Sequence, residues 1–375
     1  MTAIASRSAA TIANPRLASL ANLGQSIWLD NISRGLLSSG GLQTLVDDGV
    51  LGVTSNPTIF EKAISGSAEY DDQLAEVSRA GASPEDAFEA LAIQDIRDAA
   101  DVLRPIYDRL DGADGYVSLE VSPRLAGDTE GTAKAAERLW HAVGRPNLMI
   151  KIPATAEGLS AITATLAKGI NVNVTLLFDV DRYESVAWAY VKGLEMLAGA
   201  GKPLDRIASV ASFFVSRVDT AIDALLGDTH AGLRGQAAIA NAKLAYERFE
   251  SIFASQRFAA LRAKGARPQR VLWASTSTKN PAFKDTMYID SLIGPDTVNT
   301  VPPATLDAIK DHAEARITIR DGLAEAHAVM QSLRAAGVDL KAVAVRLERE
   351  GVASFAKSFE DLLATIERKA SAVTR

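Results

Sequence analysis

The sequence predicts a (β/α)8 barrel, an α/β fold in which eight parallel strands alternate with helices. Two features predict this fold. Eight short apolar segments alternate with longer segments of helical periodicity. The length of the chain also fits a barrel, which runs as one domain at this size. An open, doubly wound sheet is the alternative that the same alternation allows. No repeat or low-complexity linker divides the 375 residues, so residues 1–375 are expected to form a single domain.

The expected strands are short runs of apolar and β-branched residues bounded by turn-forming residues. In chain order they cover residues 26–30, 50–55, 116–121, 148–153, 170–178, 207–214, 270–275 and 296–301. Helices are expected at residues 17–23, 40–48, 56–79, 84–110, 129–143, 155–168, 181–197 and 216–264, the last broken near Gly227 and Gly232. The clearest helix start is Ser83-Pro84-Glu85-Asp86, which combines a capping serine, a proline at the first helical position and acids in the first turn.

Both ends of the chain exceed what the barrel needs. Residues 1 to about 24 are expected to form an N-terminal helical extension. Helical sequence from Pro302 to about residue 369, within a tail of residues 302–375, should pack across the barrel or over its mouth. The first 14 residues lack the continuous apolar segment of a signal peptide, and the chain has no run of about 18 apolar residues. We therefore expect a cytoplasmic protein without a membrane partner.

Composition excludes several classes of function. The net charge of −6 and the pI of about 5.4 argue against a protein that binds nucleic acid. The absence of cysteine excludes disulfides, thiolate catalysis and thiolate metal sites. The four histidines are scattered without the spacing of metal ligands, so they predict no metal site, and no cofactor is expected. An anionic substrate would need a local basic site. The sequence is compatible with a monomer or a homodimer.

Polar residues lie on one face of several expected strands, near their ends. Because side chains alternate along a strand, Asn171, Asn173 and Thr175 share one face, and Val172, Val174 and Leu176 share the other. Helix-facing positions need apolar residues, so the polar face should point into the barrel. Two carboxylates, Asp30 and Glu120, end other strands in the same way. Active sites of this fold form at the C-terminal ends of the strands.

Lys151 lies in the apolar strand Leu148-Met149-Ile150-Lys151-Ile152-Pro153. Removing a lysine from water disfavours its ammonium form and leaves a free amine available near neutral pH. Such an amine is the nucleophile that forms a Schiff base with a carbonyl substrate. On its own, this strand favours a lysine that reaches water or joins a structural ion pair. The convergence of Lys151 with two carboxylates from other strands favours acid–base chemistry around an amine.

A second group of residues could hold an anion. Arg217 follows the sixth expected strand, and the hydroxyl-rich stretch Ser275-Thr276-Ser277-Thr278-Lys279 follows the seventh. Phosphate sites in barrels often use the loops after the last strands, and charged side chains and hydroxyls supply the donors. The alternative is a hydroxyl-rich helix start with ordinary surface charges. The sequence contains neither a dinucleotide fingerprint nor a P-loop.

Six stretches together resemble the transaldolases, and the chain length with the stretch Trp273-Ala274-Ser275-Thr276 resembles their longer bacterial subgroup. In the order found in that family, they are Trp28-Leu29-Asp30, Gly52-Val53-Thr54-Ser55-Asn56-Pro57-Thr58, Ser118-Leu119-Glu120-Val121, Met149-Ile150-Lys151-Ile152-Pro153-Ala154, Ile170-Asn171-Val172-Asn173-Val174-Thr175-Leu176-Leu177-Phe178 and Ser212-Phe213-Phe214-Val215-Ser216-Arg217-Val218-Asp219. The resemblance spans most of the chain. It implies a class I aldolase-type barrel that transfers a dihydroxyacetone unit between sugar phosphates in the pentose phosphate pathway, without a metal.

The resemblance also implies roles for individual residues. Lys151 would form the Schiff base, Asp30 would be the main acid–base residue, and Glu120 with Thr175 would position a water. The remaining implied contacts are to the substrate: Asn56, Asn173 and Ser212 to its dihydroxyacetone part, and Arg217 and Ser275 to its phosphate. The chain departs from the family where many members have an arginine and this sequence has Ser277. Lys279 is the expected substitute for that charge.

Two other functions remain compatible with these residues. One is a Schiff-base aldolase that releases free dihydroxyacetone. The fructose-6-phosphate aldolases are, however, much shorter chains and tend to have tyrosine where this chain has Phe214. The other is a barrel that binds a sugar phosphate without catalysis.

Overall fold

Eight parallel strands close into a barrel, in the order in which they occur in the chain. The structure is a computed structural model that describes residues 12–373. The first eleven residues of the expected N-terminal extension and the last two of the expected tail therefore lie outside the described residues. The strands are β1 (Gln25–Leu29), β2 (Gly52–Thr54), β3 (Tyr116–Glu120), β4 (Leu148–Pro153), β5 (Val172–Leu177), β6 (Ser209–Phe214), β7 (Arg270–Ala274) and β8 (Thr297–Val301). Pairing of β1 with β8 closes the barrel and excludes the open sheet.

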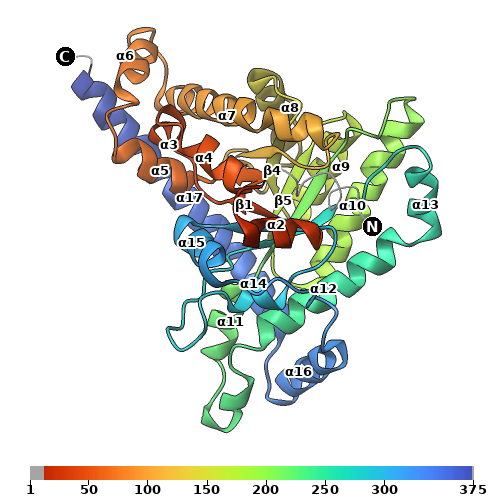
Figure 1. Ribbon diagram of the computed structural model, residues 1–375. Helices are drawn as coiled ribbons and strands as arrows, with labels where there is room; N and C mark the ends of the chain where they lie inside the picture. Colours follow the sequence, from red (N-terminus) through yellow and green to blue (C-terminus); the bar gives the residue numbers. More distant parts are fainter. Residues whose placement is uncertain (1–11, 374–375) are drawn as a thin grey trace.

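Helices surround the barrel (Figure 1). They are α2 (Pro15–Asn22), α3 (Arg34–Ser38), α4 (Gly41–Asp48), α5 (Pro57–Ser65), α6 (Asp71–Arg79), α7 (Pro84–Arg109), α8 (Thr129–Val143), α9 (Ala156–Ala167), α10 (Val180–Gly199), α11 (Ser216–Asp223), α12 (Ala237–Phe253), α13 (Gln256–Arg262), α14 (Met287–Ser291), α15 (Pro303–His312), α16 (Leu323–Ala335) and α17 (Leu340–Val373). The 3-10 turns are η2 (Pro123–Leu125) and η3 (Asp228–Leu233). Of these helices, the short α3 and α14 are the ones that the sequence did not predict.

Polar residues that directly follow strands start several of the helices. The side chains of Asn56, Thr155 and Asp179 accept hydrogen bonds from the backbone N–H groups of Ile59, Gly158 and Arg182. Each cap satisfies a donor that has no partner within its helix. Because each cap comes directly after a strand, helices α5, α9 and α10 all begin at the C-terminal end of the barrel.

The expected alternation on β5 is wrong at one position, Leu176. Its backbone has φ +63°, in the left-handed region that is unusual for a branched residue. The pairing of β5 with β6 shifts register between Val174 and Leu177. An irregularity of this kind redirects a side chain. The Leu176 side chain lies close to Gly351 of α17, because a Cβ added to that glycine would lie 2.8 Å from Leu176 Cδ2. Leu176 thus meets α17, whereas the strict alternation placed it with Val172 and Val174 against the outer helices.

The tail divides into α15, α16 and α17, with breaks at left-handed glycines that include Gly322 and Gly337. The final helix, α17, has 34 residues. It contacts α5, α6, α7, α11, β5 and η2, and Figure 1 shows it as one long helix that ends near α5 and α6. Helices α5 and α11 and the turn η2 all follow barrel strands, so α17 lies over the C-terminal end of the barrel.

A buried ion pair lies at the N-terminal end of the barrel, opposite the end that α17 covers. Arg270 Nη1 on β7 lies 3.0 Å from Asp114 Oδ2, in the loop before β3. The other Asp114 oxygen accepts a hydrogen bond of 2.8 Å from Trp28 Nε1. Ser26 also donates to Asp114, and Arg270 donates to the Thr297 carbonyl. Asp114 is fully buried and Arg270 is 8% exposed, so this largely buried network ties β1, β7 and β8 to the loop before β3.

We predict that Asp114→Ala lowers the free energy of unfolding by about 3–5 kcal/mol, the typical cost of leaving a buried charge without its partner. Denaturant unfolding measures this loss. The control is Glu195→Ala, which removes an exposed bidentate pair with Arg257 and should cost less than about 1 kcal/mol. Equal losses in the two variants would contradict the assignment.

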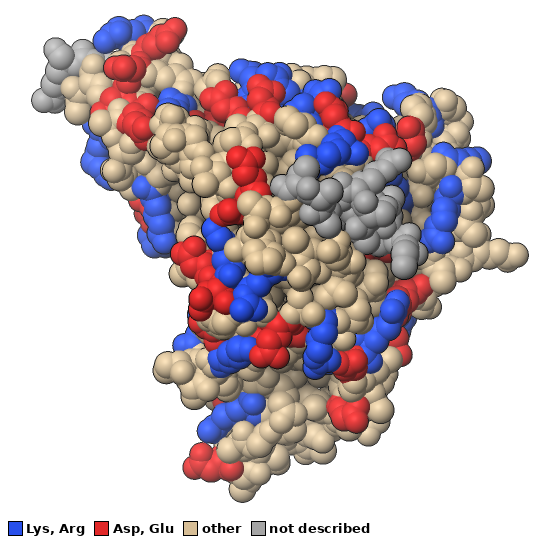
Figure 2. Space-filling view, viewed as in Figure 1, with Lys and Arg blue, Asp and Glu red and all other residues tan. Residues whose placement is uncertain are grey.

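The surface carries both signs of charge. Figure 2 shows Lys and Arg side chains interspersed with Asp and Glu over the visible face, without a continuous basic area in that view. No helix between residues 12 and 373 is both long and apolar enough to cross a membrane. The face in view therefore offers no broad basic surface to an anionic substrate.

Candidate active site

Nine of the eleven candidate residues line one cavity of about 160 Å³ at the C-terminal end of the barrel. The nine are Asp30, Asn56, Lys151, Thr175, Ser212, Arg217, Ser275, Ser277 and Lys279. The two others lie beside it: Glu120 contacts Lys151, and Asn173 contacts Ser212. Residues that are far apart in the chain thus meet because parallel strands bring their C-terminal ends together.

Lys151 is almost completely buried, with 5% of its surface exposed. Its Nζ donates to the Ser55 carbonyl oxygen at 3.1 Å and lies 3.4 Å from Glu120 Oε2. Glu120 and Lys151 are register partners on β3 and β4, and Lys151 and Asn173 are partners on β4 and β5. The three side chains therefore stand in a row on the inner face of the barrel, with the amine beside a carboxylate.

Burial dominates the electrostatics of Glu120. Its side chain is 6% exposed, and this desolvation raises the pKa of Glu120, although the charge of Lys151 opposes the rise. A carboxyl group with a raised pKa can exchange a proton with a reacting group closer to neutral pH than an exposed glutamate can.

Asp30 stands directly after β1, across the cavity from this row. Its Oδ1 accepts a hydrogen bond of 2.7 Å from Thr54 Oγ1 on β2. Thr54 is in turn 2.6 Å from Thr300 Oγ1 on β8. Because Thr54 gives its single proton to Asp30, Thr300 must donate to Thr54. This chain of hydroxyls holds one carboxylate oxygen, and no hydrogen bond of the described residues engages Oδ2.

A second layer of polar side chains supports the cavity floor. Asn173 accepts from Ser212 Oγ at 2.7 Å and donates to Ser118 Oγ at 3.0 Å. Asn173 itself does not line the cavity, so it lies behind Ser212. Thr175 is fully buried, and its hydroxyl has no hydrogen-bond partner among the described residues. A buried hydroxyl without a partner is costly, so Thr175 Oγ1 is available for a ligand or a water in the cavity.

The side of the cavity lined by Phe214, Arg217 and the loop after β7 carries positive charge. The Arg217 guanidinium lies 5.1 Å from the centre of the Phe214 ring and forms no ion pair with any residue that the structure describes. Burial lowers the pKa of Arg217, and the charge of Asp30 opposes this effect. Lys279 is exposed and lies on the same side of the cavity as Ser275 and Ser277. An unpaired, partly desolvated guanidinium is a ready partner for a phosphate.

The hydroxyl-rich loop after β7 is partly committed to internal contacts. Ser275 has φ +56°, and its hydroxyl lies 2.9 Å from that of Ser216 at the start of α11. The Ser277 hydroxyl lies 2.9 Å from that of Thr305 on α15. These bonds fix the loop against two helices beside Arg217.

The cavity has further walls that the sequence analysis did not assign. They include Thr54, Phe214, Thr300 and Phe355. Phe355 comes from α17, with its ring centre 5.5 Å from Lys151 Nζ. Its position in the sequence shows only the apolar spacing of a packed helix, which predicts a core residue and not a cavity wall.

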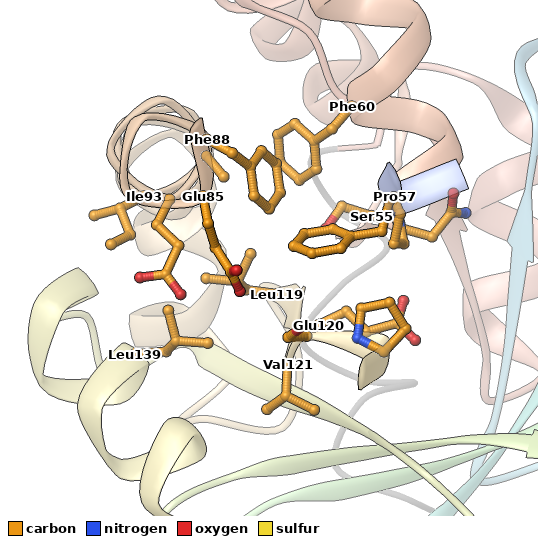
Figure 3. A pocket seen from close by; sticks show the side chains of 16 residues that line it. Ser55, Pro57, Phe60, Glu85, Phe88, Ile93, Leu119, Glu120, Val121 and Leu139 are labelled. Carbon is orange, nitrogen blue, oxygen red and sulfur yellow. The ribbon is translucent and has the colours of Figure 1, made fainter. Parts of the chain in front are cut away.

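A smaller cavity lies on the other side of Glu120 (Figure 3). Phe60 and Phe88 pack edge to face on one side of it, with ring centres 5.5 Å apart, and Glu120 and Val121 lie on the other. Its volume of about 20 Å³ leaves room for about one water. Of the two cavities beside Glu120 and Lys151, the one lined by Lys151 is therefore the one with room for a substrate.

A parallel barrel with a buried lysine beside a carboxylate at its C-terminal end holds the groups that an enzyme of the Schiff-base class needs. A sequence model of the family described as "Transaldolase/Fructose-6-phosphate aldolase" matches residues 27–366. The chain belongs to this family, which confirms the resemblance that the strand motifs indicated.

Individual relatives match nearly the whole chain. A transaldolase from Saccharopolyspora erythraea is 56% identical over 360 residues, which cover 95% of this chain and 98% of the relative. One from Acidothermus cellulolyticus is 53% identical over 357 residues, covering 94% and 96%. One from Trichodesmium erythraeum is 47% identical over 373 residues, covering 96% and 98%.

Proposed function

We propose that this chain transfers a dihydroxyacetone unit from a ketose phosphate, such as fructose 6-phosphate or sedoheptulose 7-phosphate, to an aldose phosphate, such as glyceraldehyde 3-phosphate or erythrose 4-phosphate. This is the reaction of the transaldolases in the pentose phosphate pathway. The observation that carries the proposal is the buried amine of Lys151, 3.4 Å from Glu120, in a cavity with Asp30 and an unpaired arginine. Membership of the family supports it.

In the first step, the neutral Lys151 amine adds to the ketone carbon of the donor. Loss of water then gives a protonated imine. Glu120 and Thr175 are proposed to hold that water, because the Thr175 hydroxyl is buried without a partner and Glu120 lies beside the amine. The same pair serves the reverse step, in which water adds to the imine carbon and the product leaves with Lys151 free again.

In the second step, Asp30 takes the proton of the hydroxyl on the far carbon of the bond that breaks, and this carbon becomes the aldehyde. The carbon–carbon bond cleaves, an aldose leaves, and the electron pair moves into the protonated imine to form an enamine. The acceptor aldehyde is attacked by this enamine and receives the proton from Asp30. The iminium accepts the electron pair that a metal ion would stabilise in a metal-dependent aldolase.

The remaining candidate residues are proposed to bind the substrate. Asn56 uses its side-chain oxygen as a helix cap, which leaves its NH₂ group for a dihydroxyacetone hydroxyl. Ser212, held by Asn173, contributes a second contact to that part. Arg217 and Ser275 are proposed to bind the phosphate, with Ser277 and Lys279 at the outer edge. Arg217 has the stronger support because its charge is unpaired.

The variant Lys279→Ala tests whether Lys279 takes the place of the arginine that many transaldolases have in this loop. A charged hydrogen bond is worth about 1.5–3 kcal/mol, so Lys279→Ala should raise KM for fructose 6-phosphate by roughly one to two decades. Binding of unphosphorylated dihydroxyacetone should be almost unchanged. Arg217→Ala serves as the comparison. An unchanged KM in Lys279→Ala, beside a raised KM in Arg217→Ala, would show that neutral donors replace the missing arginine.

An aldolase that releases free dihydroxyacetone is the second candidate. Phe214 lines the cavity, so the tyrosine hydroxyl that fructose-6-phosphate aldolases tend to have at this place is missing. A coupled assay with fructose 6-phosphate, with and without erythrose 4-phosphate, separates the two. We expect turnover to require the acceptor. Turnover at the same rate without acceptor would favour the aldolase, and no adduct after borohydride would favour a binding protein.

We also propose that the chain works in the cytoplasm, where sugar phosphates are made and consumed, and that residues 1–375 act as a single domain. The contacts of α17 with helices from both halves of the barrel support the second point. Analytical ultracentrifugation would decide between a monomer and a homodimer.

A further inference from the structure

Helix α17 covers Lys151 with an aromatic ring. Phe355 is 6% exposed, lines the same cavity as the lysine, and places its ring centre 5.5 Å from Lys151 Nζ. This separation is within the range of a cation–π contact. A flat apolar ring at this distance excludes water from one side of the amine.

Three contacts fix α17 across the barrel mouth. Glu348 lies 3.4 Å from Arg182 at the start of α10. The Ser358 hydroxyl lies 2.8 Å from that of Thr58 at the start of α5, and Glu360 lies 3.2 Å from Arg124 in η2. From Glu348 to Glu360 the helix is about 18 Å long, at 1.5 Å per residue. The helix is thus tied to the loops after β2, β3 and β5, and its central part lies over the mouth.

Gly351 lets helix α17 come close to Leu176 of β5. A side chain at this position would meet Leu176, whose Cδ2 lies 2.8 Å from the place of an added Cβ. Leu176 is the residue that the irregularity in β5 redirects toward α17. The close approach of α17 at Gly351 brings Phe355, one helical turn further on, down to the lysine.

From these contacts we propose that Phe355 is a specificity residue that directs the three-carbon unit on Lys151 to an acceptor aldehyde rather than to water. The inference rests on the proposed function and goes beyond it by assigning the partition between transfer and release to a residue outside the barrel strands. The ring keeps bulk water from the bound unit, while the acceptor enters the part of the cavity lined by Arg217 and Lys279.

The competing reaction needs only water. The enamine on Lys151 takes a proton at carbon and becomes an iminium. Water then adds to the iminium carbon, the carbon–nitrogen bond breaks, and free dihydroxyacetone leaves with the lysine as an ammonium. The carbon protonation is the step at which transfer is lost. A ring over the nitrogen keeps bulk water from the enamine, and the single water held by Glu120 and Thr175 serves the hydrolysis of the product imine.

The experiment measures the ratio of released dihydroxyacetone to transferred product, in addition to the rate of turnover. With fructose 6-phosphate and erythrose 4-phosphate present, free dihydroxyacetone and transferred product are quantified for wild type, Phe355→Leu and Phe355→Ala. The ratio of release to transfer should rise in that order. In Phe355→Ala the rise should be roughly 5- to 30-fold, which corresponds to about 1–2 kcal/mol between the barriers to release and to transfer. Phe355→Leu keeps most of the apolar volume, so it tests the ring even if Phe355→Ala folds poorly.

Phe359→Leu is the matched control. Phe359 lies one turn further along α17, is 2% exposed, and also has a cation near its ring, Arg124 at 5.4 Å. Its ring packs against Phe88, with centres 5.7 Å apart, and does not line the substrate cavity. Phe359→Leu should therefore lower stability without a change in the ratio.

The possible outcomes distinguish failure of the proposed function from failure of the role assigned to Phe355. A wild-type chain that forms no borohydride adduct and transfers nothing would overturn the proposed function itself. Normal transfer, with the same release ratio in wild type and both Phe355 variants, would overturn only the inference. An equal rise in Phe359→Leu and Phe355→Leu would also overturn it, because loosening of α17 would then explain the release.

Discussion

Lys151→Met should abolish turnover and the borohydride-trapped adduct together. The imine can form only on a primary amine, and losing a covalent nucleophile typically lowers kcat by a factor on the order of 10⁶. Methionine keeps most of the length of the side chain in a site where the lysine is 5% exposed. Mass spectrometry after treatment with fructose 6-phosphate and borohydride gives the readout. In the wild type it should place a three-carbon adduct on Lys151.

Loss of activity must be separated from loss of fold. Without the ammonium, the buried Glu120 has no cation beside it, so Lys151→Met should lower stability, and thermal unfolding checks that the barrel remains folded. Lys279→Met is the control: it removes another cavity-lining lysine but should keep the adduct. An adduct on another lysine, with Lys151→Met still active, would contradict the mechanism.

The inward-facing strand positions could be predicted from the sequence because they depend on local rules. Alternation within apolar strands placed Lys151 and Asn173 on inward faces, and closure of the barrel made Glu120, Lys151 and Asn173 neighbours. The alternation of strands and helices predicted the barrel as the leading fold, and the pairing of β1 with β8 decided between it and an open sheet. Such features need only the periodicity of side chains and the common direction of parallel strands.

Other parts of the site depend on contacts that no local pattern encodes. Leu176 leaves the predicted face because β5 shifts register against β6. Phe355 belongs to an apolar helical stripe that would look the same if α17 packed elsewhere. The sequence predicted a tail over the barrel or its mouth, but not which of its residues reaches Lys151. The partnership of Ser277 with Thr305 is equally non-local, because it joins the loop after β7 to the helix after β8.

The two carboxylates should fail in different ways when each is replaced by its amide. General acid–base groups typically contribute about 10²–10⁴ in rate, so Asp30→Asn and Glu120→Gln should each lower kcat by a factor in that range. Asp95→Asn is the control, since Asp95 is a buried carboxylate bound by Arg34 and Tyr70 outside the cavity. It should lower stability and leave kcat near that of the wild type.

The trapped intermediate distinguishes the two roles. Asp30 is proposed to accept the hydroxyl proton when the carbon–carbon bond breaks, so Asp30→Asn should form the imine and stop before cleavage. Borohydride should then trap the whole six-carbon donor on Lys151. Glu120 is proposed to act earlier, during loss of water, so Glu120→Gln should slow the formation of any adduct. Six-carbon adducts in neither variant, with kcat unchanged in both, would contradict the assignment.

The pH dependence follows from the burial of Glu120. Desolvation raises the pKa of this carboxyl, so its proton binds at higher pH than on an exposed glutamate. If the carboxylate form positions the water, wild-type kcat should fall as the pH drops through this raised pKa, above the value of about 4.3 for an exposed glutamate. Glu120→Gln removes the titrating group. The kcat of this variant should be lower than that of the wild type at each pH, but its plot against pH should lack this acidic decline. An identical acidic decline in the variant would assign it to another group and remove Glu120 from the water step.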